Sequence, residues 1–390
     1  MSQSKRSVSK RPKNAAQAIV PFDLIDRHVM LSVRVNNSRM LKFLLDTGNK
    51  FAIIDLDRAR ELNLKLQREV KVAGAGSQII TGYFVRDSSF TIAGLKEFSQ
   101  PITLAFPLKD LASVLGQDFD GFIGGEFIKE FVVELDYQAR VISLYARDGF
   151  KYSGRGECIP LQLNPAGHPI IEAEVSPLDS EPIKGKFVLD IGSSSSLVLY
   201  SPFVSQHKLL DARVKTIRVL GDTAGTGGEV TGRIGRVAEL RIGKFKLANP
   251  ITLFSEDKEG GFASTEIQGN IGEQILSKFK VFLDYARNRV ILEPGATFSK
   301  PFDRAFSGLG IIADGVDYRT FRIVDVLENS PASAVGIQKD DVIVAIDGRP
   351  ASEVTLSKML DMFERPRSYE LTVRRAEQTL QIKLRPAKLV

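Results

Sequence analysis

The sequence has very few of the residues that bind metals or form covalent cross-links. Its 390 residues include one cysteine, three histidines and no tryptophan. One cysteine cannot form an internal disulfide, and the scattered His28, His168 and His207 show no zinc-type spacing. A thiol nucleophile would also need a histidine partner, so we expect Cys158 to be a small buried residue. The sequence therefore predicts no metal site and no cofactor.

A long apolar run is also missing. No segment approaches the roughly 18 apolar residues of a membrane helix. No apolar stretch follows the basic N-terminus in the way that a secretion signal would. We therefore expect a soluble chain without a membrane span. The compartment stays open, because a periplasmic or exported protein can have lost its signal.

Positive charge is concentrated at the N-terminus. Residues 1–14 carry five basic side chains and no acidic one, and the net charge of the whole chain is +6, so the remainder carries only 6 − 5 = +1. A nearly neutral folded part lacks the clustered cations that phosphate backbones require, so we expect no nucleic-acid partner. Residues 1–19 are predicted to form a disordered basic leader.

What the sequence does contain is an internal repeat. The segment LLDTGN at residues 44–49 returns as VLDIGS at residues 188–193, and the two aspartates are 190 − 46 = 144 positions apart. A second pair follows in the same order, GFIGGEFI at residues 121–128 and GNIGEQIL at residues 269–276. Each of these leads to Leu-Asp-Tyr, with an offset of 284 − 136 = 148. Two matches in the same order indicate a duplicated domain.

Both copies place an aspartate at the end of a buried strand. Apolar residues alternate over residues 29–35, and a second apolar strand is expected to run into Asp46. In the second copy, residues 171–175 alternate in the same way, and the next strand runs into Asp190. Many strands and few helices predict lobes that are mainly β.

Short helices and glycine-rich turns are expected beyond each aspartate. Asp55 or Asp57 is expected to cap one helix, and Ser201 with Pro202 to begin its counterpart. Glycines then cluster in each copy, where they favour mobile hairpin tips because glycine adopts positive φ at little steric cost. The candidate flap residues are Gly74, Gly76, Gly225 and Gly227.

The repeated aspartates suggest chemistry. Asp-Thr-Gly alone would indicate only a turn, because aspartate and glycine are common turn residues. Recurrence in two lobes changes this interpretation, since a pseudo-twofold arrangement brings both loops together at its axis. Two adjacent carboxylates cannot both be charged at low cost, so one is ionised while the other holds a proton. The ionised carboxylate can take a proton from water, and the protonated one can donate to a peptide carbonyl.

The repeated motifs resemble the active-site loops and the following apolar-glycine segments of aspartic peptidases of the retropepsin and pepsin type. The resemblance covers about residues 20–296 and implies two β lobes, residues 20–150 and 151–296, with a substrate cleft between them and glycine-rich flaps over it. It implies Asp46 and Asp190 as the catalytic pair. The residues that it implies in the supporting loops are Thr47, Gly48, Asn49, Ile191, Gly192 and Ser193.

Two positions differ from the pattern of that family. Its members usually have threonine after each catalytic aspartate, where the hydroxyl braces the opposite loop. Thr47 keeps this hydroxyl and Ile191 has none. Asn49 stands where the family favours a smaller residue, although its amide can still donate to a carboxylate.

The C-terminal part resembles a PDZ domain over residues 305–388, after a linker that begins at residue 293. The motif DDVIVAIDG at residues 340–348 matches the most recognisable stretch of that family, and a helix is expected over residues 355–363. The loop that matches the carboxylate-binding loop consists of Gly308, Leu309, Gly310 and Ile311. Backbone N–H groups of such a loop bind a terminal carboxylate while the peptide adds as a strand.

The sequence thus predicts a mainly β protein with a bilobal, duplicated fold and a small α+β PDZ-like domain. The first hypothesis is an aspartic endopeptidase, active at acidic to mildly acidic pH, whose PDZ-like domain recruits or gates substrate proteins. Its partners would be polypeptide substrates and C-terminal peptides. The alternative is a catalytically inactive scaffold that binds peptides in the cleft and in the PDZ groove. Binding without turnover would distinguish the two.

Overall fold

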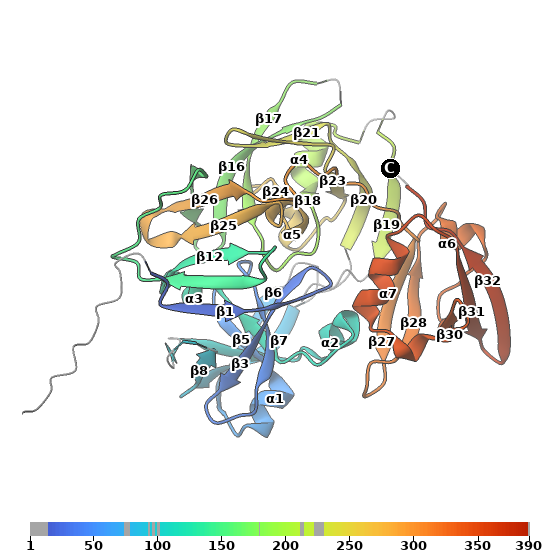
Figure 1. Cartoon of the computed structure of the whole chain (residues 1–390), viewed down its shortest axis with the longest axis horizontal. Helices are drawn as coiled ribbons and strands as arrows, with labels where there is room; N and C mark the ends of the chain where they lie inside the picture. The colour runs from blue at the N-terminus through green and yellow to red at the C-terminus, as the bar shows by residue number, and fades with distance from the viewer. Residues whose placement is uncertain are drawn as a thin grey trace, which may run out of the picture.

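The computed structural model describes residues 15–73, 79–92, 94–95, 98–99, 102–178, 180–210, 214–221 and 230–388. The candidate flap residues Gly74, Gly76, Gly225 and Gly227 lie outside these ranges. Strands dominate the described residues, and a small third domain stands beside two larger lobes (Figure 1). The fold class predicted from the sequence is confirmed.

The N-terminal lobe is built on one large sheet, and the C-terminal lobe repeats it strand by strand. The first sheet runs in the order β6 (Lys65–Ala73), β7 (Ile79–Arg86), β10 (Thr103–Phe106), β5 (Ala52–Asp55), β11 (Gly121–Ile123), β4 (Leu41–Leu45), β3 (His28–Val35), β8 (Ser89–Ile92) and β9 (Phe98–Ser99), with β2 (Asp23–Ile25) beside β3. The second runs in the order β19 (Ile217–Gly221), β20 (Val230–Arg236), β23 (Ile251–Ser255), β18 (Leu197–Leu199), β24 (Gly269–Ile271), β17 (Ile183–Leu189), β16 (Pro169–Ser176), β21 (Glu239–Ile242) and β22 (Phe245–Ala248), with β15 (Gln162–Leu163) beside β16.

A third sheet joins the two lobes and is itself symmetric. Its order is β1 (Ala18–Pro21), β13 (Val141–Tyr145), β12 (Val132–Asp136), β25 (Phe279–Asp284), β26 (Arg289–Pro294) and β14 (Glu157–Pro160). At its centre β12 pairs antiparallel with β25, with Val133 opposite Leu283. Strand β1 begins at Ala18, so it takes two residues that the sequence interpretation gave to the leader.

The symmetry of the strands places the two aspartates at equivalent points. Strand β4 pairs in parallel with β11, and β17 pairs in parallel with β24. The backbone N–H of Asp46 donates to the carbonyl of Ile123 at 2.9 Å, and that of Asp190 donates to the carbonyl of Ile271 at 2.9 Å. Each aspartate is therefore fixed where a buried strand ends.

Short helices complete the lobes. They are α1 (Leu56–Glu61), α2 (Lys109–Leu115), α3 (Gly125–Lys129), α4 (Ser201–Gln206) and α5 (Glu273–Leu276), with 3-10 turns at Gly261–Ala263 and Tyr285–Arg287. Asp55 caps α1, because its carboxylate accepts the N–H of Arg58. The predicted cap at Ser201 is wrong: Tyr200 precedes the helix, and the Ser201 hydroxyl donates to the Asp257 carbonyl instead.

Cys158 also departs from the sequence expectation, because it is exposed and not buried. It lies on edge strand β14, where the alternation of the strand turns the neighbouring Ile159 toward the core and Cys158 toward solvent. In the described part of the chain, no helix has both the length and the apolar character that a membrane crossing needs.

The third domain has a core of its own. Its sheet contains β27 (Leu309–Asp314), β28 (Thr320–Val326), β29 (Val342–Ile346), β31 (Tyr369–Arg375), β32 (Gln378–Leu384) and the short β30 (Arg349–Pro350). Helices α6 (Pro331–Ala334) and α7 (Leu356–Phe363) and a 3-10 turn at Ala351–Glu353 cover it. The linker before this domain packs on the C-terminal lobe, where Phe298 contacts Phe245 and Phe279.

Candidate active site

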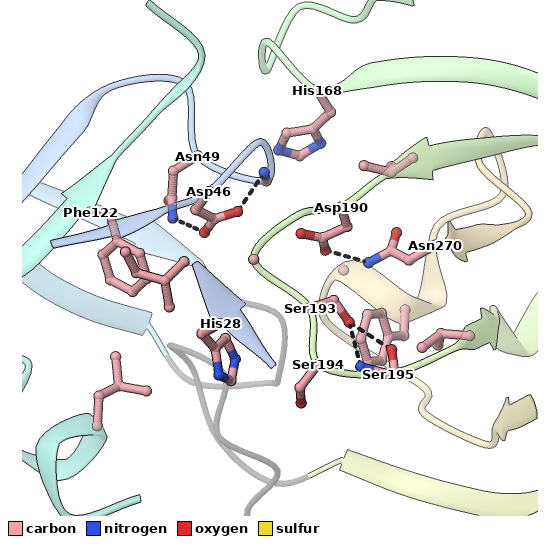
Figure 2. Close-up of a pocket in the computed structure, with 18 of the residues that line it drawn as sticks. His28, Asp46, Asn49, Phe122, His168, Asp190, Ser193, Ser194, Ser195 and Asn270 are labelled. Atoms are coloured by element: carbon pink, nitrogen blue, oxygen red, sulfur yellow. Dashed lines mark hydrogen bonds between the residues drawn. The ribbon is translucent and has the colours of Figure 1, made fainter. Parts of the chain in front are cut away.

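The two repeated aspartates meet where the lobes meet. Figure 2 shows Asp46 and Asp190 facing one another across the junction. A Cβ atom added at Gly48 would lie 3.0 Å from an Asp46 carboxylate oxygen and 3.3 Å from one of Asp190. At Gly192 the added atom would lie 2.3 Å from Asp46 Oδ1. Both positions therefore require glycine for the loops to approach this closely.

Asp46 receives two hydrogen bonds from its own loop. The backbone N–H of Gly48 donates to Oδ1 at 2.6 Å, and the Asn49 amide donates to Oδ2 (Figure 2). Donors to a carboxylate favour its charged form. Asn49, which is unusual at this position in the family named above, thus supports the ionised state of Asp46.

Asp190 has a different set of neighbours. Asn270 Nδ2 donates to Asp190 Oδ2 at 3.0 Å, and the amide oxygen of Asn270 accepts the Tyr200 hydroxyl at 2.5 Å. The backbone N–H groups of Gly192 and Ser193 also contact the Asp190 carboxyl. The Ser193 hydroxyl itself pairs with that of Ser195 at 2.6 Å and not with an aspartate.

Burial and mutual repulsion separate the pKa values of the pair. Burial raises the pKa of Asp46 to about 6, against the opposing effect of the Gly48 and Asn49 donors. Burial and the adjacent charge of Asp46 raise the pKa of Asp190 to about 8. Around neutral pH the pair therefore shares one proton, and the Gly48 and Asn49 donors favour the ionised form at Asp46.

Thr47 ties the two aspartate loops together. Its hydroxyl donates to the carbonyl of Leu189 at 2.5 Å and accepts the N–H of Ile191 at 2.9 Å. Both bonds cross from one lobe to the other, and Thr47 is fully buried. Ile191 is also buried but has no hydroxyl with which to form the symmetry-related pair of bonds.

A cleft of about 490 Å³ opens over the carboxylates. Its apolar wall on the N-terminal lobe contains Leu44, Leu111, Leu115, Phe119 and Phe122. Its apolar wall on the C-terminal lobe contains Val188, Val198, Tyr200, Leu253 and Phe262. The carboxylates thus lie at the polar centre of a largely apolar groove, an arrangement typical of binding sites for extended apolar ligands.

Asn270, His28 and His168 also line the cleft, and they were not selected as site residues from the sequence. Asn270 could have been found, because it stands opposite Phe122 in the repeat and is the polar member of that pair. His28 and His168 carried no signal, since each lies far from the repeated motifs. Burial lowers the pKa of both histidines, so both are neutral around pH 7. His168 lies against the backbone of Gly48 at the rim of the site (Figure 2).

The predicted carboxylate-binding loop begins strand β27. Gly308 has a positive φ of 84°, and a Cβ atom there would lie 2.1 Å from the Ser330 side chain, so the turn needs glycine. Leu309 to Ile311 are already in the strand, with a β-bulge after Gly310. Gly308, Leu309 and Gly310 line a second cavity, of about 710 Å³, between this domain and the C-terminal lobe.

Two family models match parts of this chain. Residues 31–127 match the family model described as aspartyl protease, and residues 299–374 match the model of the PDZ domain. Among solved structures, the chain is similar to the aspartic proteinase from Irpex lacteus, with 14% sequence identity, a TM-score of 0.45, and coverage of 73% of this chain and 99% of that one. A comparison with curated proteins gives no match.

The chain thus combines an N-terminal region similar to the aspartyl-protease family, residues 31–127, with a C-terminal region similar to PDZ domains, residues 299–374. The region matched to the aspartyl-protease family contains Asp46 and Thr47, and the strand order of the second lobe repeats that of the first around Asp190.

Proposed function

We propose that this chain is an aspartic endopeptidase in which Asp46 and Asp190 activate water for attack on a peptide bond, and whose PDZ domain recruits or gates protein substrates. The observation that carries the proposal is the adjacency of two buried carboxyl groups with separated pKa values at the centre of the cleft. Such a pair supplies a base and an acid side by side.

The reaction follows from the two protonation states. Asp46, ionised, accepts a proton from a water molecule as the water oxygen bonds to the carbonyl carbon. Asp190, protonated, donates a hydrogen bond and then its proton to the carbonyl oxygen. When the tetrahedral intermediate collapses, the C–N bond breaks, the leaving nitrogen takes the proton held by Asp46, and one hydroxyl of the intermediate returns its proton to Asp190 as it becomes the new carbonyl. Water is thus divided between a new carboxyl and a new amine, and the pair returns to one proton.

The walls of the cleft support a preference for apolar side chains on both sides of the cleaved bond. The N-terminal wall offers Phe119 and Phe122, and the C-terminal wall offers Val198 and Phe262. Burying an apolar side chain against them contributes roughly 25 cal/mol per Å². We expect charged residues directly beside the cleaved bond to be disfavoured.

The test is cleavage of an unfolded protein mixture from acidic to alkaline pH, with the products identified by mass spectrometry. Wild type should make defined cuts, and Asp46→Asn and Asp190→Asn should lose them. Asp148→Asn is a matched control, because Asp148 is exposed and distant in sequence from both loops. If all four proteins are equally inactive while apolar peptides still bind the cleft, the catalytic proposal fails and the inactive scaffold replaces it.

A further inference from the structure

Helix α2 of the N-terminal lobe belongs to two sites at once. Leu111 and Leu115 line the catalytic cleft. The same helix packs against β27, the strand that follows the carboxylate-binding loop of the PDZ domain (Figure 1). Tyr318, in the turn between β27 and β28, packs into the apolar cluster around α2. A movement of α2 would therefore change both the cleft and the edge of the PDZ domain.

The end of α2 lies directly against the first turn of α7. Gly116 ends α2 in the left-handed conformation, with φ of 65°. A Cβ atom at Gly116 would lie 2.5 Å from the Cβ of Leu356, so the two helices touch without room for one more carbon. Leu356 is the first residue of α7, at the opposite end of that helix from Phe363.

The hairpin turn between β2 and β3 adds a second contact with α7. The backbone N–H of Asp26 donates to the Ser357 hydroxyl at 3.1 Å. Arg27 forms an ion pair with Glu364 at 2.5 Å, and Arg304 pairs with the other oxygen of Glu364 at 2.7 Å. The N-terminal lobe thus covers α7 from its first turn to its C-terminal cap.

One end of the space between β27 and α7, away from α2, opens into a cavity. There Leu309 and Gly310 of the strand and Leu360 and Phe363 of the helix line the 710 Å³ cavity. Within the ranges that the structure describes, β27 pairs with β28 alone, so its other edge is available to an added strand. A polypeptide that begins in this cavity and continues along β27 meets α2.

The charged and apolar residues that line the cavity suit the C-terminus of a polypeptide. Four basic and three acidic residues line the cavity: Glu364 pairs with both Arg27 and Arg304, and Arg322 pairs with Asp314 and Asp340 outside the lining, while Lys339 forms no ion pair with the described residues. The basic residues are Arg27, Arg304, Arg322 and Lys339, and the acidic ones are Asp26, Asp325 and Glu364. Leu360 and Phe363 offer an apolar surface to one side chain. A free C-terminal carboxylate that follows an apolar last residue matches both features.

We propose that α2 is an autoinhibitory clamp, which closes the far end of the PDZ groove and is displaced when a protein C-terminus with an apolar last residue adds along β27. Displacement withdraws Leu111 and Leu115 from the catalytic cleft, so the PDZ ligand and the cleft ligand bias the same element. Ser194, Ser195 and Leu253 line both cavities and give the two sites a common wall. The expected effect on cleavage rests on the proposed function, whereas the test below measures only peptide binding and hydrogen exchange in α2.

The experiment uses the full chain and a decapeptide that ends in leucine, with a free carboxylate or a C-terminal amide. Binding is measured by titration, and α2 is followed by amide hydrogen exchange over residues 109–117. We expect the free acid to bind on the order of tenfold more tightly than the amide. We also expect the bound acid to speed exchange in α2. Binding without any change in α2 exchange overturns the clamp, and so does the absence of binding in every variant.

Gly116→Ala tests the contact itself. The added carbon pushes α2 away from Leu356, so the variant should bind the free acid on the order of tenfold more tightly than wild type. Gly348→Ala is the matched control, because Gly348 also has positive φ, 75°, but an added Cβ meets nothing within 4 Å. Ser357→Ala, which removes only the bond from Asp26, should shift affinity in the same direction by less. Equal affinity in all four proteins overturns the clamp.

The two proposals fail separately. If wild type never cleaves but α2 opens when the peptide binds, the endopeptidase proposal fails and the clamp stands. If wild type cleaves but the peptide changes neither its cleavage rate nor the hydrogen exchange of α2, the endopeptidase proposal stands and the clamp is overturned.

Discussion

The hydroxyl of Thr47 accepts the backbone N–H of Ile191 at 2.9 Å, and Ile191 has no group that returns this bond. In a fully symmetric pair of loops, each residue after the aspartate would brace the other. Here one residue does so for both, because Thr47 also donates to Leu189. The two side-chain hydrogen bonds that brace these loops against one another therefore both come from Thr47.

Replacing Thr47 with valine keeps the shape of this residue and removes both bonds. A buried carbonyl and a buried N–H lose their partner, which should cost about 2–3 kcal/mol of unfolding free energy. Loosening of the pair should lower kcat/KM on the order of tenfold or more. Thr252→Val is the control, since Thr252 is equally buried and its hydroxyl donates only to Pro250. If both variants lose stability and neither loses activity, the bonds of Thr47 have no role in activity and the prediction is contradicted.

The glycines between the carboxylates predict a graded series. Gly192→Ala would put a carbon 2.3 Å from Asp46 Oδ1, whereas Gly48→Ala would put one 3.0 Å away. We expect activity to fall by about a hundredfold or more in the first and by less in the second. Gly125→Ala should retain activity, because its nearest neighbour lies at an ordinary 3.6 Å. Steady-state kinetics on folded protein would measure the series, and equal losses at Gly192 and Gly125 would contradict it.

The pH dependence of cleavage follows from the two raised pKa values. With Asp46 at about 6 and Asp190 at about 8, the singly protonated pair is most populated near pH 7. Activity should fall below about pH 6, where both groups are protonated, and above about pH 8, where both are ionised. This range is nearer to neutrality than the acidic to mildly acidic optimum expected from the sequence. A rate profile of kcat/KM measures it, and an optimum below pH 4 would contradict it.

Asp190 should also make stability depend on pH. Its pKa in the folded state, about 8, lies above its usual value in an unfolded chain, so the folded state binds more protons between these values. Unfolding free energy therefore falls as pH rises from about 4 to about 8. Asp190→Asn removes this loss and should be more stable than wild type at pH 9 by about 1–3 kcal/mol. At pH 4 the two should be equal.

Urea unfolding at both pH values would measure this difference. Asp148→Asn serves again as the control, because an exposed carboxyl should give the same small change at both. An Asp190→Asn variant that gains nothing at pH 9 would show that the carboxyl is not held protonated by its surroundings.

The architecture could be predicted from the sequence because two separate pairs of matching segments show that the domain is duplicated. The repeats around Asp46 and Asp190, in the same order and at nearly the same spacing, predict two copies of one fold, and the strand orders of the two lobes agree. The cap at Asp55, whose carboxylate accepts the N–H of Arg58, was also predicted from neighbouring residues alone.

Other features depend on contacts between distant segments. His168 reaches the site only because its loop packs against Gly48, and α2 reaches β27 only because the PDZ domain docks on the N-terminal lobe. Neither segment carries a motif. Cys158 was placed wrongly because residue type favoured burial, while the register of an edge strand decided its orientation.

The central pairing of β12 with β25 joins the two lobes within one chain. Bringing Asp46 and Asp190 together therefore does not depend on the protein concentration. Asp46 and Asp190 come from different lobes, and a shared sheet inside one chain holds those lobes together, so the two carboxyl groups meet without a second chain. Specific activity should therefore be constant on dilution from micromolar to nanomolar, which a dilution series of initial rates would measure. A lobe on its own would present β12 as an open edge and would gain its partner only by meeting a second chain.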